Sequence, residues 1–439
     1  MDNFPHASAP AGSLFPDGDR GDLGGRGGHG DRGKAGGMHP MVKPALRRAW
    51  RSLTCVQYGV TPAHAVVLDP VDAATGRLLG LLDGTRGTGL LREEAAALGL
   101  PEGRLDALLD RLAAAGLLVA AGAGRPGRAG PAAGAVDTAL DPLRADLAAL
   151  SVVCPEPDRA LRTLAARRER RVRVRGAGRV GTAVAALLAA AGVGGVEVVD
   201  GGRVEPWETA PGGLPAESVG ERRVTAARRL VGRWARGPVA ARRTGRRAGP
   251  GDGDGGAAAS LVVVAPRDGL GVLVPDPVAA EPWMAAGTPH LYAGVLEATG
   301  WVGPLVLPGG TACARCLQEE ATDRDPVWPR LLAQWRSGAP HPLPACDVTL
   351  AAAVAGLAAA HALAFLDGEL PASTGTRWEV TAPSLGWRSE RTAPHPACPC
   401  GAARGRVGVG ASAAGEARTT RAGHGPARHG SLGIGGAHV

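Results

Sequence analysis

Lysine is almost missing from this chain of 439 residues, since only Lys34 and Lys43 stand among its 49 basic residues. Aromatic residues make up 3% of the sequence, so a hydrophobic core must be built mainly from alanine, valine and leucine. The formal net charge is +8. However, the arginines are not interleaved with aromatic residues as they are in surfaces that stack nucleic-acid bases. We therefore expect no nucleic-acid partner.

Signals for secretion and membrane insertion are also missing. Residues 1–39 are rich in Gly and Asp and contain no apolar segment of the kind found in signal peptides. The longest apolar stretches, 180–199 and 350–366, are rich in alanine and interrupted by Glu197 and His361. Buried helices and strands explain such stretches better than membrane spans. We expect a cytoplasmic protein with no membrane partner.

The seven cysteines do not resemble a disulfide scaffold, because their number is odd and four of them have metal-ligand spacing. Cys313 and Cys316 form the motif C-A-R-C, and Cys398 and Cys400 form C-P-C. Four thiolates satisfy tetrahedral Zn²⁺ and leave no open coordination position. The sequence therefore predicts a structural zinc site that joins two distant segments in a reducing compartment.

A glycine-rich turn carries the main functional signal. It follows a short strand at 171–175 and places Gly176, Gly178 and Gly181 in the pattern G-x-G-x-x-G at the start of a helix. A second strand then ends at Asp200. Such glycines let the backbone approach a phosphate, and the acidic residue can accept ribose hydroxyls. This pattern predicts a Rossmann-like nucleotide-binding unit, without separating ATP from NAD.

The strand before this turn has an unusual sequence, Arg-Val-Arg-Val-Arg. Central strands of parallel sheets are usually apolar along their whole length. We therefore expect Arg173 or Arg175 to be exposed at an edge, paired with an acidic residue or directed at the nucleotide.

Composition divides the chain into five parts. Residues 1–39 are a disordered extension, 40–120 a small α+β domain, 121–146 a linker, 147–400 the α/β domain and 401–439 a disordered tail. Gly, Ala and Pro dominate the linker, which is typical of a domain boundary. The expected fold class is therefore an α/β domain preceded by a smaller α+β domain.

The small domain has the element order of a winged helix. Strands are expected at 66–68 and 117–119, and amphipathic helices at 73–83, 90–98 and 104–115. The alternative is a helical cap that packs on the main domain. The third helix carries two arginines and two aspartates, so its charge is balanced. This favours a peptide over DNA as the ligand of a winged helix.

The ordered motifs resemble the ThiF/MoeB/HesA family, relatives of ubiquitin-activating enzymes. The resemblance extends over 147–400 and includes the glycine turn, Asp200 and both cysteine pairs. Segments 303–309, 322–329 and 395–398 look like the ThiF-like proteins of peptide natural-product clusters. In that group an N-terminal winged helix binds the leader peptide of a precursor.

The resemblance implies an ATP- and Mg²⁺-dependent adenylyltransferase that works as a homodimer. Its substrate would be the C-terminal carboxylate of a ubiquitin-like carrier protein or a peptide. Arg223 would replace a family lysine at the phosphates, and Asp268 would hold Mg²⁺ unless a one-residue shift places Arg267 there. Cys346 stands where some members carry a thioester-forming cysteine with a lowered pKa. The alternative for Cys346 is a small buried residue.

Two departures from the family pattern support a different function. Gly202 occupies the second acidic position after the second strand, and 205–212 contains no arginine for the phosphates. The alternative is therefore a catalytically degenerate relative that binds a leader peptide and serves as a scaffold for a partner modifying enzyme. An NAD-dependent oxidoreductase is disfavoured, because no His/Asp or Lys/Tyr pair accompanies the glycine turn.

Three further residues surround the expected zinc site. His395 precedes the second cysteine pair, where we expect it to support the site without binding the metal. Trp328 and Trp335 follow the first pair, and we expect both to pack beneath the zinc site.

Overall fold

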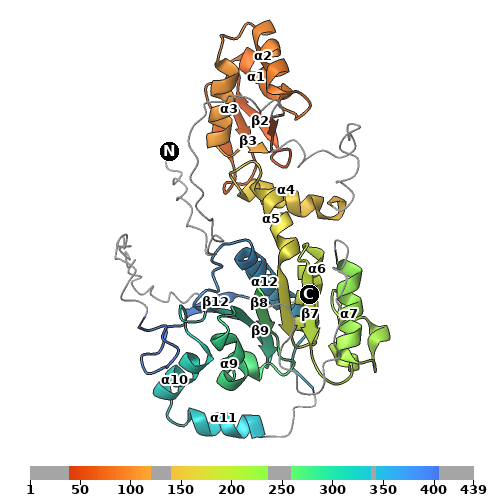
Figure 1. Ribbon diagram of the computed structural model, residues 1–439, viewed down its shortest axis with the longest axis vertical. Coiled ribbons are helices and arrows are strands. Elements are labelled where there is room, and N and C mark those ends of the chain that lie inside the picture. The colour runs from red at the N-terminus through yellow and green to blue at the C-terminus, as the bar shows by residue number, and fades with distance from the viewer. Residues whose placement is uncertain (1–38, 120–139, 236–258, 338–342, 405–439) are drawn as a thin grey trace, which may run out of the picture.

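The computed structural model describes residues 39–119, 140–235, 259–337 and 343–404. Figure 1 shows the small N-terminal domain above the larger α/β domain, with two short helices between them. Most of the expected N-terminal extension, linker and C-terminal tail lies outside the described residues. The expected combination of an α/β domain and a smaller α+β domain is confirmed.

The small domain packs three helices against short antiparallel strands. β2, β3 and β4 form one sheet, and β1 pairs with β5 in another. The core between helices and strands consists mainly of leucines, and Leu78, Leu91 and Leu112 are fully buried. The elements are β1 Met41–Val42, β2 Arg48–Ser52, β3 Cys55–Tyr58, β4 Val66–Leu68, α1 Ala73–Leu81, α2 Thr88–Ala97, α3 Arg104–Ala114 and β5 Leu118–Val119.

Helices α4 (Arg144–Val153) and α5 (Arg159–Glu169) connect the two domains. The Lys43 side chain is only 2% exposed, and its Nζ donates to the Cys154 carbonyl at the end of α4 over 2.7 Å. Burying an ammonium is costly unless it is hydrogen-bonded. This contact therefore holds the small domain against α4.

The α/β domain is built on a seven-stranded sheet with the order β12-β11-β10-β9-β8-β6-β7. The four strands from β7 to β9 are parallel, and the strands from β9 to β12 are antiparallel. The parallel half confirms the Rossmann-like unit. The strands are β6 Arg171–Arg175, β7 Gly195–Val199, β8 Leu261–Val264, β9 His290–Leu296, β10 Thr299–Val306, β11 Thr376–Thr381 and β12 Trp387–Arg391.

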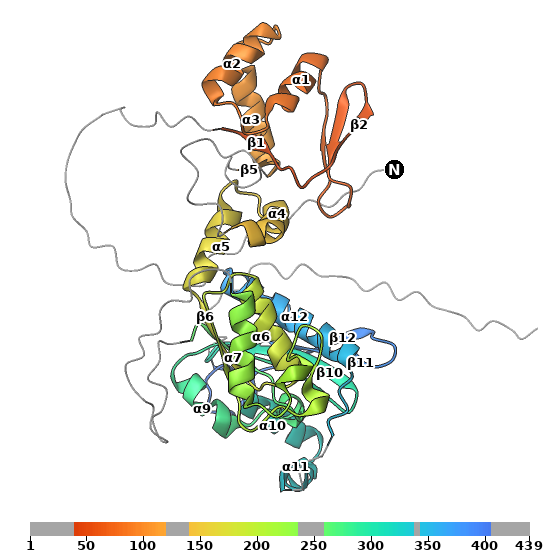
Figure 2. The same ribbon diagram turned by 90° about the vertical axis from the view of Figure 1, so that its right-hand side faces the viewer.

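Helices cover both faces of this sheet. α6 (Arg179–Ala190), α7 (Arg223–Trp234) and α12 (Val348–Leu366) share one core cluster and lie together in Figure 2. The short helix α8 (Leu270–Leu273) and α9 (Pro277–Ala285) contribute to clusters with other residues of the sheet. The remaining helices are α10 Ala314–Arg324 and α11 Trp328–Ser337.

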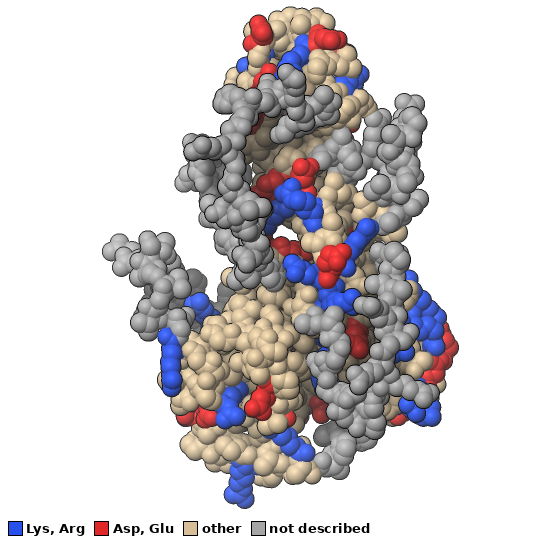
Figure 3. Space-filling model, in the orientation of Figure 1, with Lys and Arg blue, Asp and Glu red and all other residues tan. Residues whose placement is uncertain are grey.

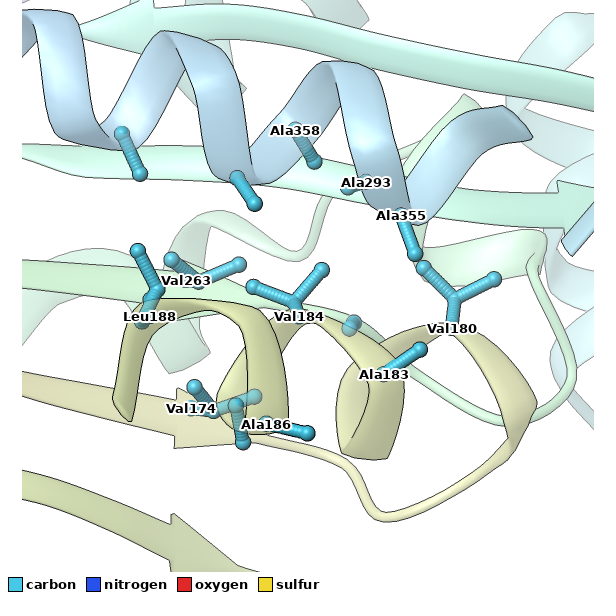
Figure 4. Close-up of a cluster of buried hydrophobic side chains, with 14 of the residues drawn as sticks. Val174, Val180, Ala183, Val184, Ala186, Leu188, Val263, Ala293, Ala355 and Ala358 are labelled. Atoms are coloured by element: carbon cyan, nitrogen blue, oxygen red, sulfur yellow. The ribbon is translucent and has the colours of Figure 1, made fainter. Parts of the chain in front are cut away.

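Small side chains allow α6 and α12 to pack closely. In Figure 4, Val180 and Val184 of α6 face Ala355 and Ala358 of α12. α12 is long and apolar enough, by composition alone, to cross a membrane. Its buried side chains belong to the core of the α/β domain, however, so packing against α6 and the sheet accounts for its composition.

Two arginines of β6 contact neighbouring elements, and Arg173 is paired with an acidic residue, which was one of the expected alternatives. Arg173 Nε lies 3.1 Å from a carboxylate oxygen of Glu197 on the neighbouring strand β7. The Arg175 guanidinium lies 5.4 Å from the centre of the Trp283 ring, a cation–π arrangement. On the face seen in Figure 3, basic and acidic side chains are interspersed.

Candidate functional site

The glycine-rich turn lies at the carboxyl ends of β6 and β7. Gly176 has a φ of +112°, and a Cβ there would lie 1.8 Å from the Ala265 carbonyl oxygen, so only glycine fits. The Asp200 carboxylate accepts hydrogen bonds from the amides of Ala177 and Gly201, each over 2.6 Å. The turn and the end of β7 are therefore joined through Asp200.

Arg267, which follows β8, lies across this turn. A Cβ at Gly178 would be 3.2 Å from Arg267 Cγ, so the arginine side chain covers the backbone that a phosphate would approach. Arg267 Nε lies 3.3 Å from Asp200 Oδ2, and its Nη1 lies 3.6 Å from Glu208 Oε1. The guanidinium thus pairs with the carboxylate expected to hold the ribose.

Arg223 is buried and paired with Glu208. Its Nε donates to Glu208 Oε2 over 2.8 Å. The side chains of Arg223 and Glu208 are 5% and 6% exposed. Its Nη1 donates to the Gly201 carbonyl over 2.8 Å. The Arg223 guanidinium is therefore occupied by contacts within the protein, whereas the sequence predicted that it would bind phosphates.

The same arginine explains the missing second acidic residue. Gly202 has a φ of +74°, and a Cβ there would lie 2.5 Å from Arg223 Nη1. No side chain fits at this position while Arg223 keeps its contacts. Charges therefore alternate along one continuous network, from Asp200 to Arg267, Glu208 and Arg223.

The residues at this site do not fit Mg²⁺. Magnesium prefers carboxylate oxygens and water in octahedral geometry. Asp200 is already paired with a cation, and Asp268 is an exposed residue just before α8. Among the described residues, no hydrogen bond or ion pair joins the Asp268 carboxylate to this network. Gly181 lies in the first turn of α6, as expected.

Cys346 lacks the properties of an activated thiol. Burial and the neighbouring Asp347 raise its pKa to about 11, although Arg179 partly opposes them. Asp347 caps α12 by accepting from the amides of Thr349 and Leu350, so the helix terminus is already satisfied. The expectation of a lowered pKa is therefore wrong. Cys346 instead packs against the core, as its alternative interpretation predicted.

The four cysteines expected to bind zinc lie together. Cys313 Sγ is 3.7 Å from the Sγ atoms of Cys316 and Cys398, and Cys316 Sγ is 3.6 Å from Cys400 Sγ. All four sulfurs lie within 4.8 Å of one another. A Zn–S bond of about 2.3 Å gives a tetrahedron with edges of about 3.8 Å. The cluster therefore fits a closed structural zinc site.

Only part of the predicted surroundings of this cluster is found. His395 Nε2 lies 2.9 Å from Asp323 Oδ2, and its Nδ1 accepts from the Ala397 amide over 3.3 Å. His395 thus fixes the loop before the second cysteine pair and is not one of the clustered ligands. Trp328 and Trp335 contact each other on α11, with ring centres 5.5 Å apart, and are not part of the hydrophobic cluster around the cysteines. The prediction that they pack beneath the site is wrong.

Comparisons with known proteins agree with this fold. The model of the ThiF family matches residues 158–400, more than half of the chain. Escherichia coli MccB with MccA superimposes with a TM-score of 0.57 at 14% identity, covering 82% of this chain and 99% of MccB. MccB with ATP gives 0.56 at 14% identity, with the same coverage of 82% and 99%. The heterocyclase TruD gives 0.52 at 18% identity, covering 84% of this chain and 43% of TruD. A search of curated protein sequences found no match.

Proposed function

The chain belongs to the ThiF family, and on this basis we propose that it recognises a precursor peptide without activating a carboxylate by adenylation. It would present the peptide to a partner modifying enzyme in the cytoplasm. The observation that carries this proposal is the ion pair between Arg267 and Asp200 across the glycine turn.

This ion pair works against bound magnesium–ATP in two ways. Asp200 is held by a guanidinium, so a ribose hydroxyl, which carries no charge, would have to replace an ion pair at the carboxylate. A metal ion beside Asp200 would also face the positive charge of Arg267. Solvent reduces this repulsion, because the Arg267 side chain is 44% exposed.

The peptide would bind through the small domain. Large apolar side chains are exposed along 48–68, namely Trp50, Leu53, Val60 and Val67. Leu53, between β2 and β3, is 94% exposed and gains nothing from folding of the domain. An exposed apolar side chain such as Leu53 is available for contact with another chain.

The solved structures support the same class of function. One of them is described as the microcin C7 biosynthetic enzyme MccB in complex with N-formylated MccA. Another is described as the heterocyclase TruD, and the match covers 43% of the TruD chain. Together with the resemblance to ThiF-like proteins of peptide natural-product clusters, they favour a role in the modification of a peptide.

The second candidate is ATP-dependent adenylyl transfer to the C-terminal carboxylate of a ubiquitin-like carrier protein or a peptide. The glycine turn at the start of α6 favours it, because helix amides at such a turn bind phosphate. The Arg267 side chain is 44% exposed and would have to leave Asp200 when a nucleotide enters.

A titration with ATP separates the candidates, and a titration with a peptide tests the binding site on the small domain. Calorimetry of the zinc-loaded protein with ATP and MgCl₂ should show no heat of binding. A fluorescent peptide with the leader sequence of a precursor encoded beside this gene should bind, as measured by anisotropy. Leu53→Asp should weaken peptide binding, whereas the matched control Leu90→Asp on α2, also at an exposed leucine, should not. Micromolar ATP binding together with ATP–pyrophosphate exchange would overturn the proposal.

A further inference from the structure

The arginines of the small domain fall into two groups. Those of the first group contact acidic side chains or backbone carbonyls, and they are Arg86, Arg92, Arg104 and Arg111. Those of the second group are exposed and have no acidic partner among the described residues, and they are Arg47, Arg48, Arg51 and Arg77. The first group has its partners within the chain, whereas the second leaves its positive charge available to another molecule.

Three arginines of the second group lie on β2 or next to it, and we call Arg47, Arg48 and Arg51 the β2 arginines. Among the strands that the structure describes, β2 pairs only with β3, so it forms an edge of the three-stranded sheet. In Figure 2, β2 lies at one side of the small domain and α2 at the other. The charge of the β2 arginines therefore gathers at one edge of the domain, away from the paired Arg92.

The outer edge of β2 offers backbone hydrogen-bonding groups between these arginines. The Gly59 amide donates to the Arg47 carbonyl over 2.8 Å, so Arg47 directs its carbonyl toward β3. Directions alternate along an antiparallel pair, and Arg48 and Trp50 therefore direct their amides and carbonyls away from β3. An extended peptide can add to such an edge through its own backbone.

Trp50 stands among the β2 arginines and offers them an apolar neighbour. A Cβ at Gly76 of α1 would be 2.9 Å from Trp50 Cη2, so the ring lies against α1, yet Trp50 is 46% exposed. Opposite charges and apolar contacts between facing residues both stabilise paired strands. We propose that β2 binds an acidic segment of the precursor peptide, in which acidic residues stand on both sides of an apolar residue that faces Trp50. This inference rests on the proposed function and adds the chemical class of the peptide.

A nucleic acid is the other ligand that unpaired arginines attract, because phosphates carry negative charge. Proteins of the helix-turn-helix type place a recognition helix in the major groove of DNA. Here the third helix, α3, exposes Asp106 and Asp110, which would repel phosphates. The outward amides and carbonyls of β2 also match the backbone of a peptide, and a nucleic acid has no such backbone. An acidic peptide therefore fits this edge better than DNA.

Defined peptides test the charge preference on the full-length chain. The probe is a rhodamine-labelled peptide of three Thr-Glu-Leu-Glu repeats, and its binding is measured by fluorescence anisotropy. The same peptide with Gln in place of every Glu should bind about tenfold more weakly or worse. Raising the salt from about 0.05 M to about 0.5 M should remove most of this difference, because exposed charges are screened.

Charge reversal in the protein tests the site independently. The double variant Arg47→Glu/Arg51→Glu should lose the Glu peptide and instead bind a peptide with Lys in place of every Glu. The control Arg92→Glu/Arg162→Glu makes the same charge change at exposed arginines of α2 and α5 and should leave binding of the Glu peptide unchanged. Thermal unfolding of every variant confirms that the protein is folded.

The leader peptide of the encoded precursor separates this inference from the proposed function. Leader binding that is lost in Arg47→Glu/Arg51→Glu would support both. Leader binding that is unchanged in this variant and insensitive to salt would leave the proposed function in place and overturn the acidic preference. A Glu peptide that binds no better than its Gln counterpart would overturn it as well. A short DNA duplex that displaces the Glu peptide at equal concentration would assign the β2 arginines to a nucleic acid instead.

Discussion

Arg267 Nε lies 3.3 Å from Asp200 Oδ2, so the carboxylate at the end of the second Rossmann strand already has a cationic partner within the chain. The same Asp200 oxygen accepts the Ala177 amide of the glycine turn. Arg267 therefore neutralises the acidic group of the nucleotide site and covers part of its backbone.

Removing Arg267 should uncover a nucleotide site. In Arg267→Asp, Asp200 loses its cation and a second carboxylate appears beside it, so Mg²⁺ and ATP should now bind. Calorimetry should give a measurable affinity for the variant and none for the wild type. Adding Asp200→Ala should abolish the gain, whereas Arg336→Asp on α11 should not produce it. If Arg267→Asp still fails to bind ATP, features other than this ion pair have closed the site.

Zinc should be required for stability of the α/β domain. Cys313→Ser removes one of four ligands, so bound zinc should fall from one ion per chain to none. A loss of about 3 kcal/mol would lower Tm by about 10 °C for a domain of this size. Cys55→Ser, a cysteine outside the cluster, is the matched control. Metal content and calorimetric unfolding measure both effects, and an unchanged Tm would contradict a structural role.

Zinc binding should also weaken as the pH falls. A hydrogen bond from Cys313 and burial raise the pKa of Cys316 to about 12, so this thiol must release a proton when it binds the metal. Competition with a chromophoric chelator at several pH values measures the dependence. An affinity that does not change with pH would show that the thiols are already ionised.

His290 should make folding stability fall in mild acid. Its side chain is fully buried, and burial lowers its pKa from 6.5 to about 4. Between these values the unfolded chain binds the proton and the folded chain does not, so stability is full above about pH 6.5. It should then fall by up to about 3 kcal/mol as the pH approaches 4.

Denaturant unfolding at several pH values checks this expectation. His290→Phe should flatten the dependence over that range, because its ring does not titrate. His64→Gln, a change at an exposed histidine, should leave the dependence as it is. The same slope in wild type and His290→Phe would assign the acid sensitivity to other groups.

Lys43 should couple the small domain to the rest of the chain. In Lys43→Met the side-chain length is kept, but the Cys154 carbonyl loses its donor. Leaving a buried carbonyl unsatisfied costs about 1–3 kcal/mol. Limited proteolysis near α4 should accelerate relative to wild type and to Arg77→Met, a change at an exposed residue of α1. Equal rates would mean that other contacts hold the domain in place.

Sequence patterns predicted those parts of the molecule that depend on local rules. The glycine turn and Asp200 were predicted because the strand, the turn and the helix follow one another in a single unit of about 30 residues. The cysteine pairs were predicted because their spacing reflects coordination chemistry. Strand β2 was missed, because all five of its residues are exposed and show no alternation. α9 was missed because Pro282 lies inside it.

The direction of long side chains could not be predicted in this way. Sequence placed Arg267 and Asp268 within one residue of the metal position, but only the fold shows that Arg267 turns toward Asp200. Likewise, Glu208 had no predicted role, although it is buried between two arginines. The pKa of Cys346 was predicted wrongly for a similar reason. Its position near a helix N-terminus predicted a lowered pKa, but burial and the neighbouring Asp347 raise it.

The burial of Lys43 also provides a way to measure how often the small domain separates from α4. Lys34 and Lys43 are its only lysines, so Lys34→Arg leaves a single side-chain amine in the protein. That amine is 2% exposed and donates to a carbonyl of the neighbouring helix. An amine-reactive dye can modify it only while the small domain is separated from α4. The labelling rate of this one group would therefore report how often the two parts come apart, and how a bound peptide changes that frequency.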